Sequence, residues 1–336
     1  MLKNKVCGIK GMGFYMPEKK VSIKELAKQS GIPEFVVDAL GAETVREANA
    51  DEYPSDMAIK AALDALENGD VDPLDIDTII YCGAGVPDYI LPHTAGKIQH
   101  AIGAKNAFAF DISQGCCGML TAIQLAKGYI SLGEGINNVM LVTGDKWSQF
   151  TRFHSADSVF FGDGGGAAIF SKGHGDFSPL STEIITKGEF YDLWCVQAGA
   201  LRHPASRETL ESKDMHTYVC LDLDRARHEF KDIYVPDLIN AVKGALKKCS
   251  LEPSDVSYFD MVNNNLKVQE IIMNKLGIPV EKSSAGYLQR FGHFGGQDIF
   301  LNLHMAKKEK KIKKGDIIVM LTAGIGFSWG SAVFQY

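Results

Sequence analysis

The residues of this chain best suited to covalent chemistry are Cys116 and His293, because they occupy matching places in an internal repeat. Cys116 follows a glycine at the start of an amphipathic helical pattern, and His293 lies in a glycine-rich turn before a second such pattern. A thiolate attacks carbonyl and thioester carbons, and an imidazole accepts the thiol proton. If the two copies of the repeat pack around a pseudo-twofold axis, we expect the two side chains to meet in one site.

The repeat has a spacing of about 180 residues and covers helices as well as strands. The matched segments, first copy then second, are 57–66 and 238–246, 71–77 and 251–257, 78–82 and 258–262, 115–118 and 292–296, 119–132 and 298–308, and 139–144 and 317–324. Apolar strand patterns alternate with helical patterns, which is typical of sheets covered by helices on both faces. We therefore predict an α/β protein built from two similar halves.

The boundary between the halves is predicted where turn-forming residues, SKGHG at 171–175, interrupt the apolar pattern. The N-terminal half is then 1–172 and carries the cysteine, and the C-terminal half is 173–336 and carries the histidine. Residues 178–232 have weak periodicity and no counterpart in the first half. We expect an insertion there.

The composition is that of an ordinary globular protein: 336 residues, 46% hydrophobic and 23% charged, with a net charge of −6. This charge argues against a nucleic-acid partner, which needs a broad basic face. The lysine-rich stretch 307–314 is expected to be a solvated helix end. We find neither a signal peptide nor a run of about 18 apolar residues, so a soluble, cytoplasmic protein without membrane contact is expected.

The seven cysteines have no disulfide-framework or zinc-site spacing, so we expect a reducing compartment and no metal. The unpaired N–H groups and the dipole at a helix N-terminus would lower the pKa of Cys116 and favour its thiolate. A small buried thiol is the alternative interpretation of this residue. Asp298 could orient the imidazole of His293, or could simply complement the positive end of its own helix.

Three motifs resemble the thiolase superfamily, in particular beta-ketoacyl-acyl carrier protein synthase III. They are FDISQGCCG at 110–118, FGDGGGAA at 161–168 and GIGFSWGSA at 324–332. The resemblance implies the five-layered αβαβα thiolase fold, a homodimer, and a ping-pong reaction in which Cys116 takes an acyl group from a thioester. It implies an oxyanion hole formed by the backbone N–H groups of Cys116 and Gly326, and no cofactor besides the acyl thioester of acyl carrier protein or coenzyme A.

The sequence departs from this family beside the cysteine. The family's histidine lies in a His-Gln-Ala-Asn stretch, where this chain has VNNN at 262–265, and the family's asparagine turn contains His293 instead. The two polar roles are therefore predicted to have exchanged places. An ungapped alignment puts Val262 on the family's histidine and makes Asn265 the catalytic asparagine, whereas a comparison with thiolases favours Asn263.

The resemblance also suggests residues that contact the carrier and the acyl chain. Lys267 matches a basic residue that the family presents to acyl carrier protein, and Lys275 follows on the same predicted helix. Both could equally be ordinary exposed lysines. Arg46 is retained from the family's coenzyme A segment, although the stacking tryptophan and arginine are missing. Leu91 matches the residue that closes the acyl pocket across the family's dimer interface.

Three functions are compatible with these residues. The first is a condensing enzyme of fatty-acid-related or specialised lipid or polyketide biosynthesis, which joins two thioesters through an acyl-Cys116 intermediate. The second is an acyltransferase of the same fold that passes the acyl group to an oxygen or nitrogen acceptor. The third is a non-catalytic partner subunit of an active homologue.

Overall fold

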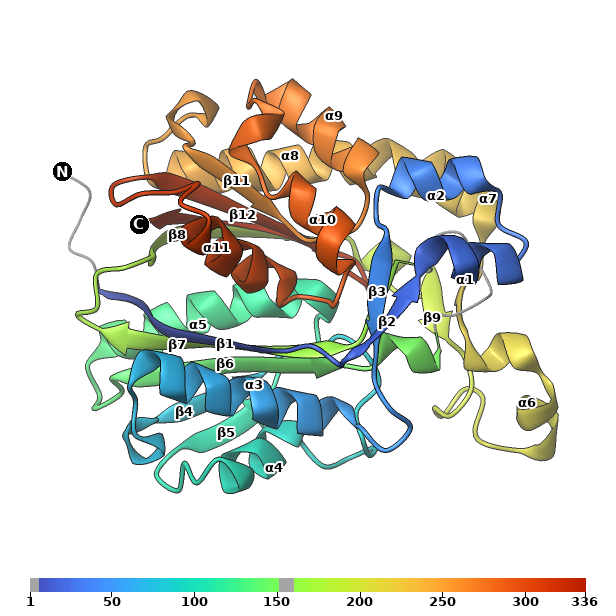
Figure 1. Ribbon diagram of the computed structural model, residues 1–336, viewed down its shortest axis with the longest axis horizontal. Helices are drawn as coiled ribbons and strands as arrows, with labels where there is room; N and C mark the ends of the chain where they lie inside the picture. The colour runs from blue at the N-terminus through green and yellow to red at the C-terminus, as the bar shows by residue number, and fades with distance from the viewer. Residues whose placement is uncertain (1–5, 151–159) are drawn as a thin grey trace.

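Two mixed β-sheets form the centre of the molecule (Figure 1) in a computed structural model that describes residues 6–150 and 160–336. The first sheet has the order β1-β7-β6-β4-β5, and the second has the order β8-β13-β12-β11. The strands are β1 (Cys7–Tyr15), β4 (Thr78–Tyr81), β5 (Phe108–Asp111), β6 (Asn138–Asp145), β7 (Gly164–Lys172), β8 (Ser178–Thr186), β11 (Tyr258–Met261), β12 (Ile317–Gly324) and β13 (Ser328–Gln335).

The two sheets repeat one topology. In each, an antiparallel edge strand (β1 or β8) pairs with the next strand (β7 or β13), which pairs antiparallel with β6 or β12. The third strand pairing that the two sheets have in common, β4 with β6 in the first and β11 with β12 in the second, is parallel. The predicted repeat is therefore a repeat of structure, and its apolar strand runs are buried because helices cover both faces of each sheet.

Helices form three layers around the two sheets, giving five layers in total, as Figure 1 shows from bottom to top. α3 (Pro54–Gly69) and α4 (Thr94–Ala101) cover the outer face of the first sheet, and α8 (Lys231–Lys248) and α9 (Leu266–Leu276) cover that of the second. Between the sheets lie α5 (Gly118–Leu132) and α11 (Asp298–Lys308), whose apolar side chains form the central core. The predicted αβαβα arrangement is confirmed.

Small residues let α3 approach the first sheet closely. Ala58, Ala61 and Ala65 on its inner face are fully buried. A side chain at Gly144 of β6 would come within 2.0 Å of the Pro54 carbonyl oxygen, and one at Gly165 of β7 within 2.4 Å of another α3 carbonyl. These glycines are therefore required by the backbone-to-backbone contact of helix and sheet.

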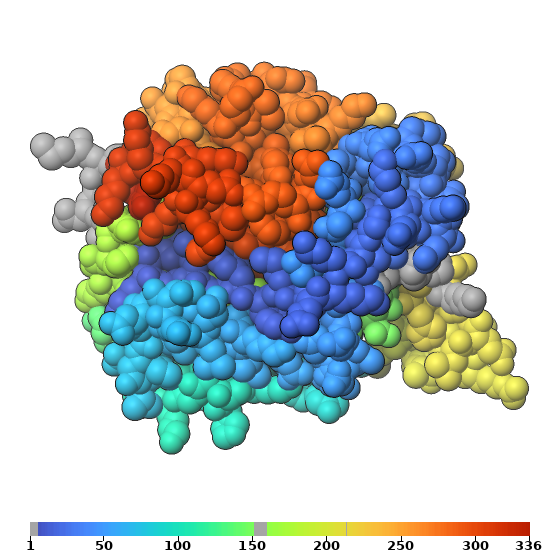
Figure 2. Space-filling model, viewed as in Figure 1, coloured from blue at the N-terminus to red at the C-terminus, as the bar shows by residue number. Residues whose placement is uncertain are grey.

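The expected insertion differs from what the structure contains. Its first residues form β8, an integral strand of the second sheet that matches β1 of the first. The sequence pattern was weak here because β8 carries Ser, Thr and Glu side chains and is only partly buried. Of the expected insertion, 187–230 lies outside the repeated topology, and the chain around α6 (Arg207–Glu211) projects from the body in Figure 2.

The remaining elements surround one end of the sheets. They are β2 (Lys19–Ser22), α1 (Ile23–Gln29), α2 (Glu34–Leu40), β3 (Thr44–Glu47), β9 (Trp194–Val196), β10 (Tyr218–Cys220), α7 (Leu223–Arg225) and α10 (Ala285–Phe291). Members of this group share an apolar cluster with Trp147, Phe160 and Phe161. Among the described residues, none of the helices has both the length and the apolar character needed to cross a lipid bilayer.

Candidate active site

Cys116 lies in a 3₁₀ turn, Gly115–Cys117, between β5 and α5. The turn packs against the hairpin that joins β12 and β13. Gly115 has a φ of +53°, and a side chain there would come within 2.6 Å of the Ile325 backbone nitrogen. Glycine is required on both counts, and this close packing places the thiol of the first half against the second half.

His293 is held by backbone contacts with the first half of the chain. The Gly162 N–H donates to the His293 carbonyl over 2.8 Å, and the His293 N–H donates to the Phe160 carbonyl over 3.0 Å. Phe161 and His293 thus form a parallel β-bridge. The FGD segment of one half therefore fixes the Gly-His turn of the other.

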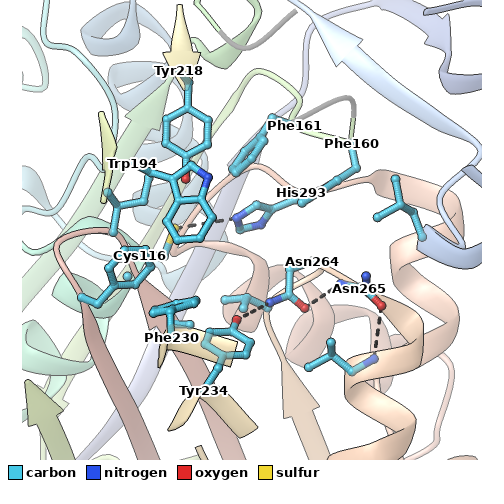
Figure 3. Close-up of a pocket in the computed structure, with 17 residues that line it drawn as sticks. Cys116, Phe160, Phe161, Trp194, Tyr218, Phe230, Tyr234, Asn264, Asn265 and His293 are labelled. Atoms are coloured by element: carbon cyan, nitrogen blue, oxygen red, sulfur yellow. Dashed lines mark hydrogen bonds between the residues drawn. The ribbon is translucent and has the colours of Figure 1, made fainter. Parts of the chain in front are cut away.

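The structure brings the two reactive side chains together. The Cys116 Sγ lies 3.7 Å from the His293 Nε2, and both residues are buried (Figure 3). The His293 Nδ1 contacts the Asp298 Oδ2, and that carboxylate also accepts the N–H groups of Phe294 and Asn263, each over 2.9 Å. A carboxylate at Nδ1 holds the proton there and leaves Nε2 free to accept the thiol proton.

An aromatic cavity of about 270 Å³ opens onto this pair. Seven aromatic side chains of the described residues line its wall: Phe160, Phe161, Trp194, Tyr218, Phe230, Tyr234 and Phe327. Four of them come from 187–234, so the chain between β8 and the first turn of α8 supplies much of the wall. The cavity can take up an apolar acyl chain beside the sulfur.

The pKa of Cys116 differs from the expectation drawn from its place near a helix N-terminus. Burial raises the pKa of this thiol well above its usual range, and the negative charges of Asp145 and Asp298 raise it further. Desolvation disfavours the charged thiolate of a fully buried cysteine. The resting residue is therefore a thiol, and any reaction that uses its sulfur as a nucleophile needs a base to take the proton.

Asp145, at the end of β6, is a buried carboxyl that the sequence analysis did not single out. Its Oδ1 accepts the N–H groups of Ala84 over 2.8 Å and Gly85 over 2.6 Å, and its Oδ2 accepts the Thr143 hydroxyl over 3.1 Å. Burial raises the pKa of Asp145 to about 6, against the opposing effect of these hydrogen bonds. Above that pH its charge opposes ionisation of the nearby Cys116.

We predict that Asp145→Asn will speed alkylation of Cys116 by iodoacetamide at pH 8 about three- to tenfold, since a one-unit fall in thiol pKa increases the thiolate fraction tenfold. Asparagine retains an oxygen for the Ala84 and Gly85 N–H groups. The alkylation rates of the wild type and of Asp145→Asn should converge below about pH 6, where wild-type Asp145 is protonated. Asp111→Asn is the matched control, because Asp111 also accepts two backbone N–H groups, those of Thr94 and Ala95. A rate equal to wild type for Asp145→Asn would contradict the prediction.

Comparisons with known proteins agree with the resemblance of the three motifs to the synthase III family. Residues 110–188 match the 3-oxoacyl-[acyl-carrier-protein] synthase III family, and 246–336 match its C-terminal domain. The beta-ketoacyl-[acyl-carrier-protein] synthase III of Clostridioides difficile is 32% identical over 335 residues, covering 99% of each chain. The chain belongs to the 3-oxoacyl-[acyl-carrier-protein] synthase III family. The resemblance stated from the motifs is thereby confirmed.

Two further family members give the same relationship. The synthase III of Syntrophomonas wolfei is 30% identical over 330 residues, covering 98% of this chain and 97% of its own. The crystal structure of the synthase III of Aquifex aeolicus superposes with a TM-score of 0.83 at 26% identity, covering 98% of this chain and all of that one. The thiolase fold is thus shared over essentially the whole chain.

The three asparagines after β11 have different surroundings. The Asn263 side chain is fully buried and exchanges hydrogen bonds with Asn302, and it does not line the cavity. Asn265 does line it, and its Oδ1 caps α9 by accepting the Val268 N–H over 3.2 Å. Asn264, which the sequence analysis passed over, also lines the cavity. The comparison with thiolases pointed to Asn263 because VNNNL at 262–266 resembles a Val-Asn-Glu-Ala-Phe segment of those enzymes, but in the structure Asn264 and Asn265 line the cavity and Asn263 does not.

The residues suggested for carrier and acyl contacts lie outside the cavity of their own chain. Lys267 and Lys275 are exposed at opposite ends of α9, with Lys267 two residues from Asn265. The Arg46 guanidinium donates to the carbonyl oxygens of Pro17 and Glu18, over 2.9 and 3.1 Å, so it ties β3 to the N-terminal segment. Leu91 is 97% exposed.

Gly326 lies between Ile325 and Phe327, which both line the cavity, and its φ is +104°. Its N–H has no hydrogen-bond acceptor among the described residues. The position is compatible with the expected oxyanion hole, in which this N–H and that of Cys116 would face one substrate oxygen. Within 6–150 and 160–336 there is no group of three or more His, Cys, Asp or Glu side chains arranged to hold a metal ion.

Proposed function

We propose that this protein is an acyl-thioester-dependent condensing enzyme that works through an acyl-Cys116 intermediate. The observation that carries the proposal is the chain of contacts from the Cys116 sulfur through the His293 imidazole to the Asp298 carboxylate, at the wall of an apolar cavity. Membership of the synthase III family supports the same activity. The substrates are thioesters of acyl carrier protein or coenzyme A, and no cofactor takes part.

In the first half-reaction His293 Nε2 takes the Cys116 proton as the sulfur attacks the thioester carbonyl. The imidazolium is stabilised by Asp298 and returns the proton to the departing carrier thiolate. The N–H groups of Cys116 and Gly326 are the donors that would stabilise the tetrahedral oxyanion, an effect worth about 3–4 kcal/mol per donor. Because burial raises the thiol pKa, proton transfer and attack are coupled.

In the second half-reaction a carbanion formed by decarboxylation of a second thioester attacks the acyl carbonyl. A carbon–carbon bond forms, carbon dioxide is released, and the carbon–sulfur bond to Cys116 breaks. The sulfur leaves as a thiolate, takes up one proton from solvent through the His293 imidazole, and the site returns to its resting state. This reaction would place the protein in fatty-acid-related or specialised lipid or polyketide biosynthesis.

Acyl transfer to an oxygen or nitrogen acceptor is the second candidate. It is favoured by the Asp298-His293-Cys116 arrangement, in which the base can also deprotonate a hydroxyl or amine. Val262, an apolar residue, lines the cavity at the place where the family resemblance puts a histidine. A function as a non-catalytic partner subunit is the least consistent with these contacts.

In the deciding experiment, the purified protein is incubated with a panel of acyl-coenzyme A thioesters. The mass of the peptide that contains Cys116 is then followed. The acylated protein is then mixed with malonyl-coenzyme A. Release of carbon dioxide with a 3-oxoacyl product supports condensation. Turnover only in the presence of a hydroxyl or amine acceptor would establish the acyltransferase instead. Absence of any adduct would refute both and leave the partner-subunit function.

For the carrier, we propose that the exposed face of α9 meets the acidic acyl carrier protein. Lys267, beside the cavity wall, and Lys275 on the same helix provide the positive charge. Complementary charges of this kind mainly raise the association rate. Arg46, engaged with two backbone carbonyls, is the least suited of the candidates to bind a carrier. In the described part of the chain none of the cysteines forms a disulfide, which supports a reducing compartment such as the cytoplasm.

We also propose that the protein is a homodimer whose interface includes the segment around Leu91. Tyr89, Ile90 and Leu91 are 75%, 70% and 97% exposed, a contiguous apolar patch of the kind that monomers seldom display. Leu91→Asp is predicted to shift the sedimentation of the protein from dimer to monomer. Leu201→Asp, a control at a leucine that is 98% exposed in the projecting segment, should remain dimeric. A dimer formed by Leu91→Asp would exclude this interface.

A further inference from the structure

The cavity wall formed by the end of β11 and the start of α8 has polar groups that no family motif predicts. Val262 contributes only apolar surface, and the polar side chains on this side are Asn264, Asn265 and Tyr234 (Figure 3). In the figure, Asn264 and Tyr234 lie across the cavity from His293. This wall is where a second substrate would be held once Cys116 carries an acyl group.

Hydrogen bonds fix the orientation of the Asn264 amide. Its Oδ1 accepts the Asn265 backbone N–H over 2.6 Å, so its Nδ2 has to face the other way. There it donates to the Tyr234 hydroxyl over 3.2 Å. If the amide were flipped, its Nδ2 group would face the Asn265 backbone N–H, and two donors would then oppose each other. Asn264 is thus fixed as the donor to Tyr234.

This orientation leaves two hydrogen-bond donors available in the cavity. The Tyr234 oxygen accepts one hydrogen bond, and its own proton has no acceptor among the described residues. The Asn264 amide has a second N–H besides the one it donates. Burial raises the pKa of Tyr234 to about 12, so the hydroxyl keeps its proton at neutral pH. Two neutral donors side by side match one substrate oxygen.

The tyrosine ring is held in place by aromatic neighbours. Its centroid lies 5.2 Å from that of Phe230 and 6.2 Å from that of Trp329, and Trp329 is fully buried. Tyr234 belongs to the first turn of α8, whereas Asn264 follows β11. The pair therefore joins two separate elements into one rigid wall, as a preorganised binding group requires.

Resting on the proposed condensing function, we propose that the Tyr234 hydroxyl and the Asn264 amide together bind the thioester carbonyl oxygen of the second substrate. As that substrate loses carbon dioxide, negative charge develops on this oxygen, and the two donors stabilise it. His293 is then left to serve Cys116 alone. A hydroxyl or amine acceptor carries no such oxygen, so the pair also selects for a carbanion-forming thioester.

Tyr234→Phe tests the hydroxyl without removing the ring, and Asn264→Asp tests the amide. An aspartate keeps the acceptor for the Asn265 N–H but accepts the Tyr234 proton, so both donors are lost. Tyr234→Phe should slow condensation with malonyl-coenzyme A at least tenfold more than it slows acylation of Cys116. Asn264→Asp should slow both half-reactions, because its new carboxylate in the cavity wall also opposes ionisation of Cys116. Tyr191→Phe, at an exposed tyrosine outside the cavity, is the matched control and should behave as wild type.

A binding measurement separates this proposal from the proposed function. The affinity of malonyl-coenzyme A is measured by calorimetry for Cys116→Ala and for the same variant carrying Tyr234→Phe. We expect the second variant to bind about tenfold more weakly, whether or not the wild type turns over. Equal affinities, or a parallel loss of acylation and condensation in Tyr234→Phe, would overturn the assignment. Failure of the wild type to form any acyl adduct would instead overturn the proposed function.

Discussion

Cys116→Ala is expected to eliminate the acyl adduct and to lower turnover by about 10³-fold or more, because the variant has no nucleophile to form the covalent intermediate. The measurement is intact mass spectrometry after exposure to an acyl-coenzyme A thioester, followed by peptide mapping. The cavity and the Asp298-His293 contact should survive, since alanine is smaller than cysteine and the turn is held by its glycine.

The adjacent Cys117 provides the matched control for this experiment. It is fully buried and faces β13, where its sulfur would lie 2.9 Å from a side chain placed at Gly330. Burial raises the pKa of Cys117 to about 12. Cys117→Ala should therefore keep the adduct and most of the activity. An adduct that persists in Cys116→Ala and disappears in Cys117→Ala would reverse the assignment.

His293→Ala is expected to slow acylation of Cys116 by about 10²- to 10⁴-fold, the usual contribution of a positioned general base. Burial keeps Cys116 as a thiol, and among the described residues the His293 imidazole is the group hydrogen-bonded to its sulfur and able to take the proton. The rate constant is measured by rapid mixing with the acyl thioester and quenching for mass analysis. His100→Ala, at an exposed histidine on α4, is the control and should leave the rate unchanged.

In the same assay, Asp298→Asn tests whether the carboxylate keeps the proton of the His293 imidazole on Nδ1. An amide nitrogen facing Nδ1 would favour the imidazole with its proton on Nε2, which cannot accept the thiol proton. We expect acylation to slow by about 10²-fold or more while the fold is kept, as happens when the carboxylate of a nucleophile-base-acid triad is replaced. Wild-type rates in Asp298→Asn would show that the carboxylate only complements the helix end.

The sequence was informative wherever the chemistry follows from local pattern. The repeat predicted two matching sheets and the central helices after Cys116 and His293, because apolar periodicity reflects which face of an element is buried. Glycine-flanked turns marked the two reactive residues. The place of Asp298, five residues after His293 and in the first turn of the second helical pattern, suggested the contact that the structure contains.

Several features depend on contacts between distant segments and leave no local signal. The proton state of Cys116 depends on how deeply the two halves bury it and on carboxylates from β6 and α11. Arg46 is held by backbone carbonyls that only the folded N-terminal segment places nearby. The strand β8 was mistaken for part of an insertion because its polar residues conceal the pairing with β13.

The amino-acid sequence by itself determined the architecture, the family and the meeting of Cys116 with His293, because burial period, turn glycines and motif spacing are local properties. Tertiary structure alone decided which asparagines line the cavity and that Tyr234 meets Asn264. Tyr234 and Asn264 are 30 positions apart in the chain, and a hydrogen bond between them exists only when folding has brought both partners within about 3 Å.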